Sequence, residues 1–330
     1  MKQRKLLGQG GSVSEIGLGC MNFTGFYGPS SVEEAHATMA AALDVGIDFF
    51  DTSNIYGFGR SEAFIGSFLK ATGAQVTTAT KAGIWRDEEH GNRGFNNQRG
   101  YLREQLEASL RRLNVDRVDL FYIHRRDQSL EIEEVMETLL TFKKEGKIGG
   151  IGFSEIAPSS LRRAAAVGQV DAVQSEYSLW TRQPELGLLQ TCKSLGVALV
   201  PYSPLGRGIF AGRRLDPMMF ADGDWRRRNP RFCAPNFQHN MQMVRGFEDF
   251  ARELGISPAT LAVGWCLSRG PHVLPIPGTR KPEHIRECAA ASDFDFTAEI
   301  GERLEALLPV GWAHGDRYAP EQWNGPEGYC

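Results

Sequence analysis

Four ionisable residues lie where short apolar segments of this 330-residue chain end, or within five residues of such a point: Asp51, Tyr56, Lys81 and His124. A carbonyl group that accepts a hydride also needs a proton on its oxygen, and a phenol with a pKa of about 10 releases that proton reluctantly. A neighbouring ammonium stabilises the phenolate, and a carboxylate keeps the ammonium charged. Tyr56, Lys81 and Asp51 fit these three roles, and His124 can hydrogen-bond the same oxygen.

Each of these residues also has a purely structural interpretation. Asp51 could cap a turn or a helix, Tyr56 could be a core or interface aromatic, and His124 could be a hydrogen-bonded polar residue of a rim. Lys81 is harder to explain in this way, because a lysine directly after a buried strand is unusual. The occurrence of all four at successive strand ends favours a proton-donating site.

The elements that must position these residues alternate between strand and helix. Eight such units favour parallel strands with right-handed crossovers, and an α/β (β/α)8 TIM barrel over an open doubly wound sheet. In such a barrel all strand ends meet on one rim. The expected strands are 16–20, 47–50, 76–81, 118–123, 148–153, 170–174, 197–201 and 273–276. The expected helices are 31–45, 61–70, 98–113, 130–145, 158–167, 184–195, 239–254, 258–268, 282–291 and 298–307.

Two further segments complete the predicted architecture of a single domain over 1–330. A β-hairpin is expected before the barrel, with Gly8 to Gly11 as its turn. The segment 205–238 is too long for an ordinary connection, so we expect it to cover a ligand. The first expected helix, 31–45, begins with the pattern of a capping box, which is Ser31 with Glu34 three residues later.

Composition favours a cytoplasmic enzyme. The net charge of −3 gives no reason to expect a nucleic-acid or anionic-membrane partner. No apolar run reaches the roughly 18 residues of a membrane span, and the apolar stretch near the N-terminus is too short for a signal peptide. The six cysteines have no C-x-x-C spacing, so we expect reduced thiols and no metal site.

The segment Gly46 to Gly57, with the sequence GIDFFDTSNIYG, resembles the signature of the aldo-keto reductase superfamily. The resemblance continues in order over almost the whole chain, at 80–81, 122–125, 152–154, 173–177, 202–208 and 276–280. The segment 224–232 resembles the bacterial and plant branch that includes pyridoxal and perakine reductases. The resemblance implies a carbonyl reductase with Tyr56 as proton donor, Lys81 and Asp51 as its tuning pair, and His124 as the group that orients the carbonyl.

The resemblance also implies an extended nicotinamide cofactor on the barrel rim, which fits the lack of a Rossmann-type glycine motif. Ser154 and Gln174 would bind the carboxamide, and Tyr202 would stack on the nicotinamide ring. The remaining residues implied for the cofactor are Ser203, Leu205 and Arg207 along the pyrophosphate, and Gly278, Thr279, Arg280, His284 and Cys288 at the adenosine end. The family usually has Arg and Asn where this chain has His284 and Cys288. We therefore expect NADPH and keep NADH open.

The substrate side is expected at the rim. Aromatic residues there suit a flat or apolar carbonyl compound, whereas the arginines could attract an acidic one. The candidates are Phe26, Tyr27, Trp85, Phe95, Arg125, Arg126 and Trp225. The sequence leaves the oligomeric state open.

Two alternatives stay open. In a barrel aldolase Lys81 would form a Schiff base with the substrate, although the residues from Ser154 to Tyr202 argue for a nicotinamide cofactor. In a cofactor-binding regulatory protein turnover would be slow, although the complete set of four ionisable residues argues for retained chemistry.

Overall fold

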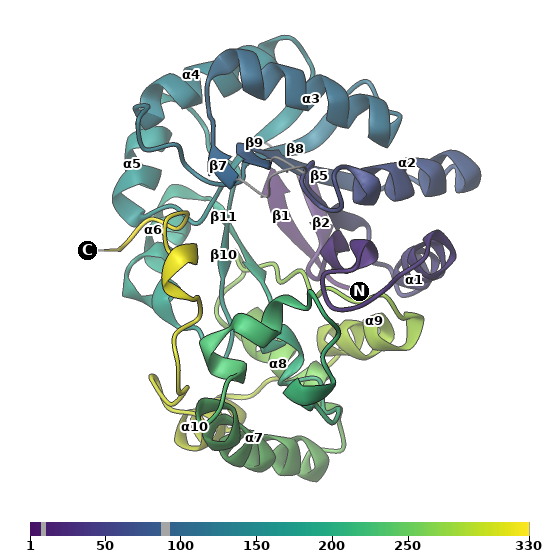
Figure 1. The fold of residues 1–330 in the computed structure, drawn as a ribbon, viewed down its shortest axis with the longest axis vertical. Coiled ribbons are helices and arrows are strands. Elements are labelled where there is room, and N and C mark those ends of the chain that lie inside the picture. Colours follow the sequence, from purple (N-terminus) through teal and green to yellow (C-terminus); the bar gives the residue numbers. More distant parts are fainter. Residues whose placement is uncertain (8–10, 87–92, 330) are drawn as a thin grey trace.

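The computed structural model describes residues 1–7, 11–86 and 93–329. Its centre is a parallel seven-stranded sheet in the order β11-β10-β9-β8-β5-β4-β3, which confirms the predicted parallel topology (Figure 1). The strands are β3 (Leu18–Gly19), β4 (Phe49–Asp51), β5 (Thr77–Ala82), β8 (Val118–Ile123), β9 (Ile148–Ser154), β10 (Ala172–Glu176) and β11 (Ala198–Tyr202).

The segment from Val273 to Gly278 closes this sheet into a barrel. Isolated bridges join Val273 and Ile276 to β11, and Gly278 to β3. The backbone N–H groups of Leu274 and Ile276 donate to β11, but the residues that face β3 are Pro275 and Pro277, which have no N–H to donate. Their carbonyls only accept from Gly17 and Gly19. The expected eighth strand is therefore present as a bridging segment and not as a regular ladder.

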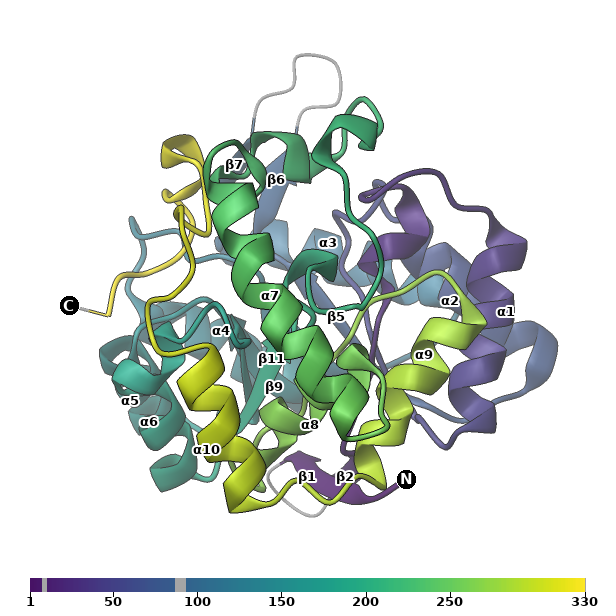
Figure 2. The ribbon, with the colours of Figure 1, turned by 90° about the horizontal axis from the view of Figure 1, so that it is seen from below.

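Ten α-helices among the described residues surround and extend the barrel (Figures 1 and 2). They are α1 (Val32–Asp44), α2 (Arg60–Thr72), α3 (Arg99–Leu113), α4 (Ile132–Lys144), α5 (Pro158–Val167), α6 (Leu188–Leu195), α7 (Asn236–Glu253), α8 (Pro258–Ser268), α9 (Pro282–Ala289) and α10 (Ala298–Leu307). Helix α1 begins as predicted, because the side chains of Ser31 and Glu34 each accept from the other residue's backbone N–H at 3.2 Å.

Apolar side chains fill the inside of the barrel, and the N-terminal hairpin covers one end of it. Interior residues include Phe49, Ala79, Leu120 and Val200 from the strands. The predicted N-terminal hairpin is present as β1 (Gln3–Leu7) and β2 (Gly11–Ser14), and its Leu6 packs into the same cluster. The hairpin lies at the opposite end of the molecule from the β6–β7 hairpin described next (Figure 2). Residues 8–10 of its expected turn lie outside the described residues.

Three segments that extend beyond the end of the barrel opposite the N-terminal hairpin were not expected in their observed form. The first is an antiparallel hairpin of β6 (Ile84–Arg86) and β7 (Arg93–Phe95). The second is the segment 205–238, which contains four short 3-10 helices and gives way to α7 at Asn236. The third is the irregular C-terminal segment 309–329, drawn in yellow in Figure 2.

Candidate active site

The predicted ionisable side chains lie in the mouth of the barrel because of their spacing along the strands. Side chains alternate between the two faces of a strand, so a residue two positions after an interior residue also points inward. Asp51 is the second residue after interior Phe49, Lys81 is the second after interior Ala79, and His124 is the second after interior Tyr122. The same rule places Gln174 after Ala172 and Tyr202 after Val200. These five side chains therefore form one polar layer directly above the apolar interior.

Lys81 lies at the bottom of this polar layer and is fully buried. Its Nζ forms an ion pair with Asp51 and donates to the Thr52 carbonyl at 2.8 Å. Burial alone would lower the pKa of Lys81, but the Asp51 carboxylate and Tyr56 raise it above its usual value. Burial raises the pKa of Asp51, and the Lys81 ammonium opposes that shift. The pair therefore holds a charged ammonium beside Tyr56.

Tyr56 lies on a turn after β4 and lines the cavity. The next residue, Gly57, has a φ of +59°, and a Cβ there would come within 2.6 Å of Thr24, so only glycine fits the turn. Lys81 Nζ lies 5.2 Å from the centre of the Tyr56 ring. Burial raises the pKa of Tyr56, and the Lys81 ammonium offsets part of this rise. Tyr56 is thus protonated at neutral pH, with a cation in place to stabilise its phenolate.

The His124 ring packs edge-on against Tyr56, with ring centres 5.8 Å apart. Burial lowers the pKa of His124 well below its ordinary value, and repulsion from Arg125, Lys81 and Arg93 adds to the effect. The imidazole is therefore neutral. Its Nδ1 lies 3.0 Å from Ser53 Oγ. When Ser53 donates its hydrogen to Nδ1, Nε2 carries the ring proton and can donate to a carbonyl oxygen in the cavity.

Ser154 and Gln174 offer a donor and an acceptor that match a primary carboxamide. Arg125 donates to Ser154 Oγ at 3.0 Å, which leaves the Ser154 hydroxyl hydrogen free to donate. Gln174 Nε2 donates to Asp51 Oδ2 at 2.8 Å, which leaves Gln174 Oε1 as an acceptor. Both residues line the cavity. The two side chains therefore present one hydrogen-bond donor and one acceptor to the cavity.

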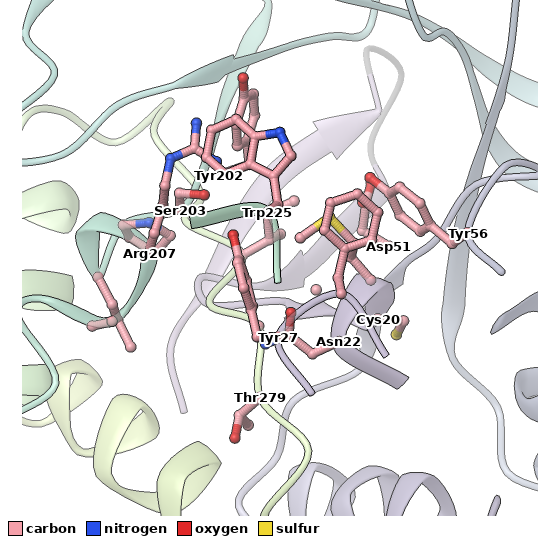
Figure 3. A pocket seen from close by; sticks show the side chains of 18 of the residues that line it. Cys20, Asn22, Tyr27, Asp51, Tyr56, Tyr202, Ser203, Arg207, Trp225 and Thr279 are labelled. Carbon is pink, nitrogen blue, oxygen red and sulfur yellow. The ribbon is translucent and has the colours of Figure 1, made fainter. Parts of the chain in front are cut away.

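These groups open into one elongated cavity of about 440 Å³. Figure 3 shows Asp51 and Tyr56 on one side of it, and Tyr202, Ser203 and Arg207 on the other. Ser203 has a φ of +52°, which turns the chain sharply away from β11. Cys20, a cavity residue that the sequence analysis did not select, lies beside Asp51 and is fully buried.

The segment 205–238 covers this cavity, and two of its arginines stack on aromatic rings. Arg207 lies 4.0 Å from the Trp225 ring centre, and Arg226 lies 4.6 Å from that of Tyr27. Arg207 and Leu205 line the cavity, as expected. However, Arg207 Nη2 pairs with buried Glu176 at 2.7 Å, so its charge is already neutralised.

The expected adenosine-end residues come together at the start of α9. Gly278, Thr279, Arg280, His284 and Cys288 all line the cavity. A buried Nη1 of Arg280 has no hydrogen-bond partner among the described residues. Burial, and then Arg213, lower the pKa of His284, so Arg280 and Lys281, and not His284, supply the positive charge where α9 begins. Burial raises the pKa of Cys288 to about 12, so it is present as a thiol.

The predicted substrate residues divide into two groups. Phe26, Tyr27, Trp225 and Arg125 line the cavity. In contrast, Trp85, Phe95 and Arg126 are not part of its wall, and this corrects the sequence-based expectation. Trp85 is 38% exposed and lies over Gly94 of its own hairpin, while Arg126 pairs with Glu327 at 3.3 Å.

Arg86, Arg93 and Tyr318 are among the further cavity residues that sequence reasoning missed. Tyr318 belongs to the C-terminal segment, and its hydroxyl lies 2.6 Å from that of Tyr202. The signal that could have found the two arginines is the short segments 84–86 and 93–95, which follow the third expected strand and pair as a hairpin. Nothing in the local pattern around Tyr318 indicates its position.

Comparisons with known proteins agree with this geometry. A family model described as "Aldo/keto reductase family" matches residues 15–309. The chain is 40% identical to the aldo-keto reductase yakc [NADP(+)] of Schizosaccharomyces pombe, over 94% of this chain and 92% of the relative. It is 36% identical to the probable aldo-keto reductase 1 of Glycine max, with 95% and 91% covered. The solved glycerol dehydrogenase of Gluconobacter oxydans superimposes with a TM-score of 0.85 at 28% identity, with 93% and 94% covered.

Proposed function

The chain belongs to the aldo/keto reductase family, and from this premise we propose that it reduces an aldehyde or ketone to the alcohol with NADPH. Bound NADPH supplies the hydride, and the chain's own residues bind the reactants and deliver the proton. The NADP(+) in the name of the yakc relative supports this cofactor. So do the free donor of Ser154, the free acceptor of Gln174 and the unpartnered Nη1 of Arg280.

The observation that carries the proposal is the ammonium of Lys81 beside Tyr56. Its Nζ is held between Asp51 and the Thr52 carbonyl, and it does not reach the cavity wall. A buried cation in this place stabilises the phenolate that forms when Tyr56 gives its proton to the substrate oxygen. The neutral His124 imidazole donates to the same oxygen and fixes its position. Proton delivery therefore needs no group from solvent.

The same observation argues against the aldolase. A Schiff base requires a neutral amine that can reach the substrate carbonyl carbon. Asp51 and Tyr56 raise the pKa of Lys81 against the effect of burial, and the Lys81 amine is enclosed behind Tyr56. The amine is thus neither neutral nor accessible. The regulatory alternative differs only in rate and is separated by the experiment below.

The experiment has two steps. Titration of the protein with NADPH and, separately, with NADH, followed by fluorescence, measures the two dissociation constants. The NADPH complex is then mixed with aromatic and aliphatic aldehydes and ketones, and the loss of reduced nicotinamide is followed together with alcohol formation. We expect one alcohol for each NADPH oxidised. Tight binding without oxidation by any compound of the panel would instead support the regulatory alternative.

A further inference from the structure

A buried guanidinium without an ion-pair partner lies next to the reacting groups. Arg125 directly follows His124, lines the cavity and is 8% exposed. Its Nη1 donates to the His124 carbonyl at 2.6 Å and to Ser154 Oγ at 3.0 Å. Its Nε is buried without a hydrogen-bond partner, and no carboxylate of the described chain lies within ion-pair distance. Burial opposes the charge of Arg125, but nearby groups, Glu155 among them, favour it, so the cost in folding free energy that remains is that of the unpartnered Nε donor.

In the part of the chain that the structure describes, three other arginines with buried side chains have the ion-pair partner that Arg125 lacks. Arg126, the next residue, pairs with Glu327, and Arg317 pairs with Glu155. Arg207, on the other side of the cavity, pairs with Glu176. Among the described residues, buried Arg231 also has no ion-pair partner, but it lies away from the cavity and donates to the Thr181 hydroxyl and the Gly315 carbonyl, whereas Arg125 lines the cavity.

Two further arginines line the same cavity from the β6–β7 hairpin. Arg86 and Arg93 are direct partners across its two strands. Both side chains are exposed to solvent on one side, and partial desolvation of Arg93, followed by repulsion from Arg125 and Arg86, lowers its pKa. The positive charges of Arg125 and Arg93 also contribute to the lowered pKa of His124. Arg125, Arg93 and Arg86 therefore place three positive charges at this end of the described cavity, separately from Arg280 and Lys281 before α9.

Resting on the carbonyl reduction proposed above, we propose that the substrate is an aldehyde or ketone that also bears an anionic group, a carboxylate or a phosphate. Arg125, with Arg93 and Arg86, binds the anion while the carbonyl oxygen lies at Tyr56 and His124. Guanidinium groups suit this role, because their planar N–H donors match both kinds of anion. The bound anion supplies the ion-pair partner that Arg125 lacks in the described part of the chain.

Matched substrate pairs test this inference. The carboxylate pair is para-carboxybenzaldehyde and its neutral methyl ester, and the phosphate pair is glyceraldehyde phosphate and glyceraldehyde. The measured quantity is the ratio of kcat/KM for the anionic compound to that for its neutral partner. We expect Arg93→Gln to lower this ratio about 10- to 100-fold, the range for a lost hydrogen bond to a charged group. Arg93 is the better target because Arg125 also holds Ser154 and the His124 carbonyl.

The control is Arg163→Gln, which removes an equal charge from the outer surface of α5, where Arg163 pairs with Glu133. We expect this variant to leave the ratio unchanged. Added salt should raise KM for the anionic partner and not for the neutral one. A fall confined to one pair identifies the anion as carboxylate or as phosphate. An unchanged ratio for both pairs in Arg93→Gln overturns the inference.

These measurements distinguish failure of the anion site from failure of the proposed function. If the neutral aldehydes are reduced while the ratio does not respond to Arg93→Gln, the function stands and the anion site is refuted. If no aldehyde oxidises NADPH, the function fails, and equilibrium binding decides the inference alone. In that measurement benzoate should bind the wild-type protein more tightly than benzamide does, and Arg93→Gln should remove the difference. Equal binding of benzoate and benzamide to the wild type would refute the anion site.

Discussion

The ion pair that anchors the C-terminal segment should make the free energy of unfolding depend on pH. Glu155 and Arg317 are both buried, and two guanidinium nitrogens of Arg317 bond the Glu155 carboxylate. Burial would raise the pKa of Glu155, but Arg317 lowers it from 4.5 to about 2. At about 1.36 kcal/mol for each pH unit, this corresponds to about 3 kcal/mol of folding free energy.

The sign follows from the depressed pKa. The unfolded chain binds the proton near pH 4.5 and the folded chain only near pH 2, so the contribution is complete above 4.5 and is lost as pH falls toward 2. Glu155→Gln removes this titration. The difference in unfolding free energy between wild type and variant, from urea denaturation, should therefore shrink by about 3 kcal/mol over this window.

The control for this series is Glu145→Gln, which removes an exposed ion pair with Arg103. We expect little change from it at any pH, because solvent screens such pairs. A constant difference between wild type and Glu155→Gln from neutral pH down to the acid limit would refute the reasoning. It would mean that Glu155 and Arg317 do not form the pair in solution.

Three further predictions concern the site. Lys81→Met should suppress reduction more than Asp51→Asn at equal folded fraction, since only the first removes the cation beside the acid; the reverse order in steady-state rates would contradict this. Burial, followed by Arg125 and its neighbouring cations, holds His124 neutral, so kcat/KM should show no inflection near pH 6.5; an inflection that His124→Gln abolishes would contradict it. Arg280→Ala should raise the dissociation constant of NADPH about 10- to 100-fold and that of NADH much less, whereas equal losses would show that the 2′-phosphate is not bound there.

The barrel and its ionisable layer could be predicted because both follow from short-range rules. Alternation of strand and helix forces parallel pairing, and the period of two residues brings Asp51, Lys81 and His124 to one rim. Their positions follow from where each apolar run ends. The ion pair between Lys81 and Asp51 was expected from chemistry, although the net pKa of Tyr56 is raised, because burial outweighs the ammonium.

Other features depend on contacts that have no local signature. Pro275 and Pro277 leave the last barrel segment without donors toward β3, so it forms bridges and no ladder. Tyr318 reaches the cavity only because Arg317 inserts beside Glu155, more than a hundred residues away. Trp85 was assigned to the substrate side from its residue type, but its strand orientation places it over Gly94.

The rate of hydride transfer in Tyr56→Phe tests the central claim most directly. The phenylalanine variant keeps the ring beside Lys81 and His124 and loses only the hydroxyl proton. In a single turnover of the preformed NADPH complex with a saturating aldehyde, we predict oxidation about 100- to 10,000-fold slower than in the wild type, with nearly unchanged NADPH affinity. A single-turnover rate close to that of the wild type would show that Tyr56 is not the proton donor.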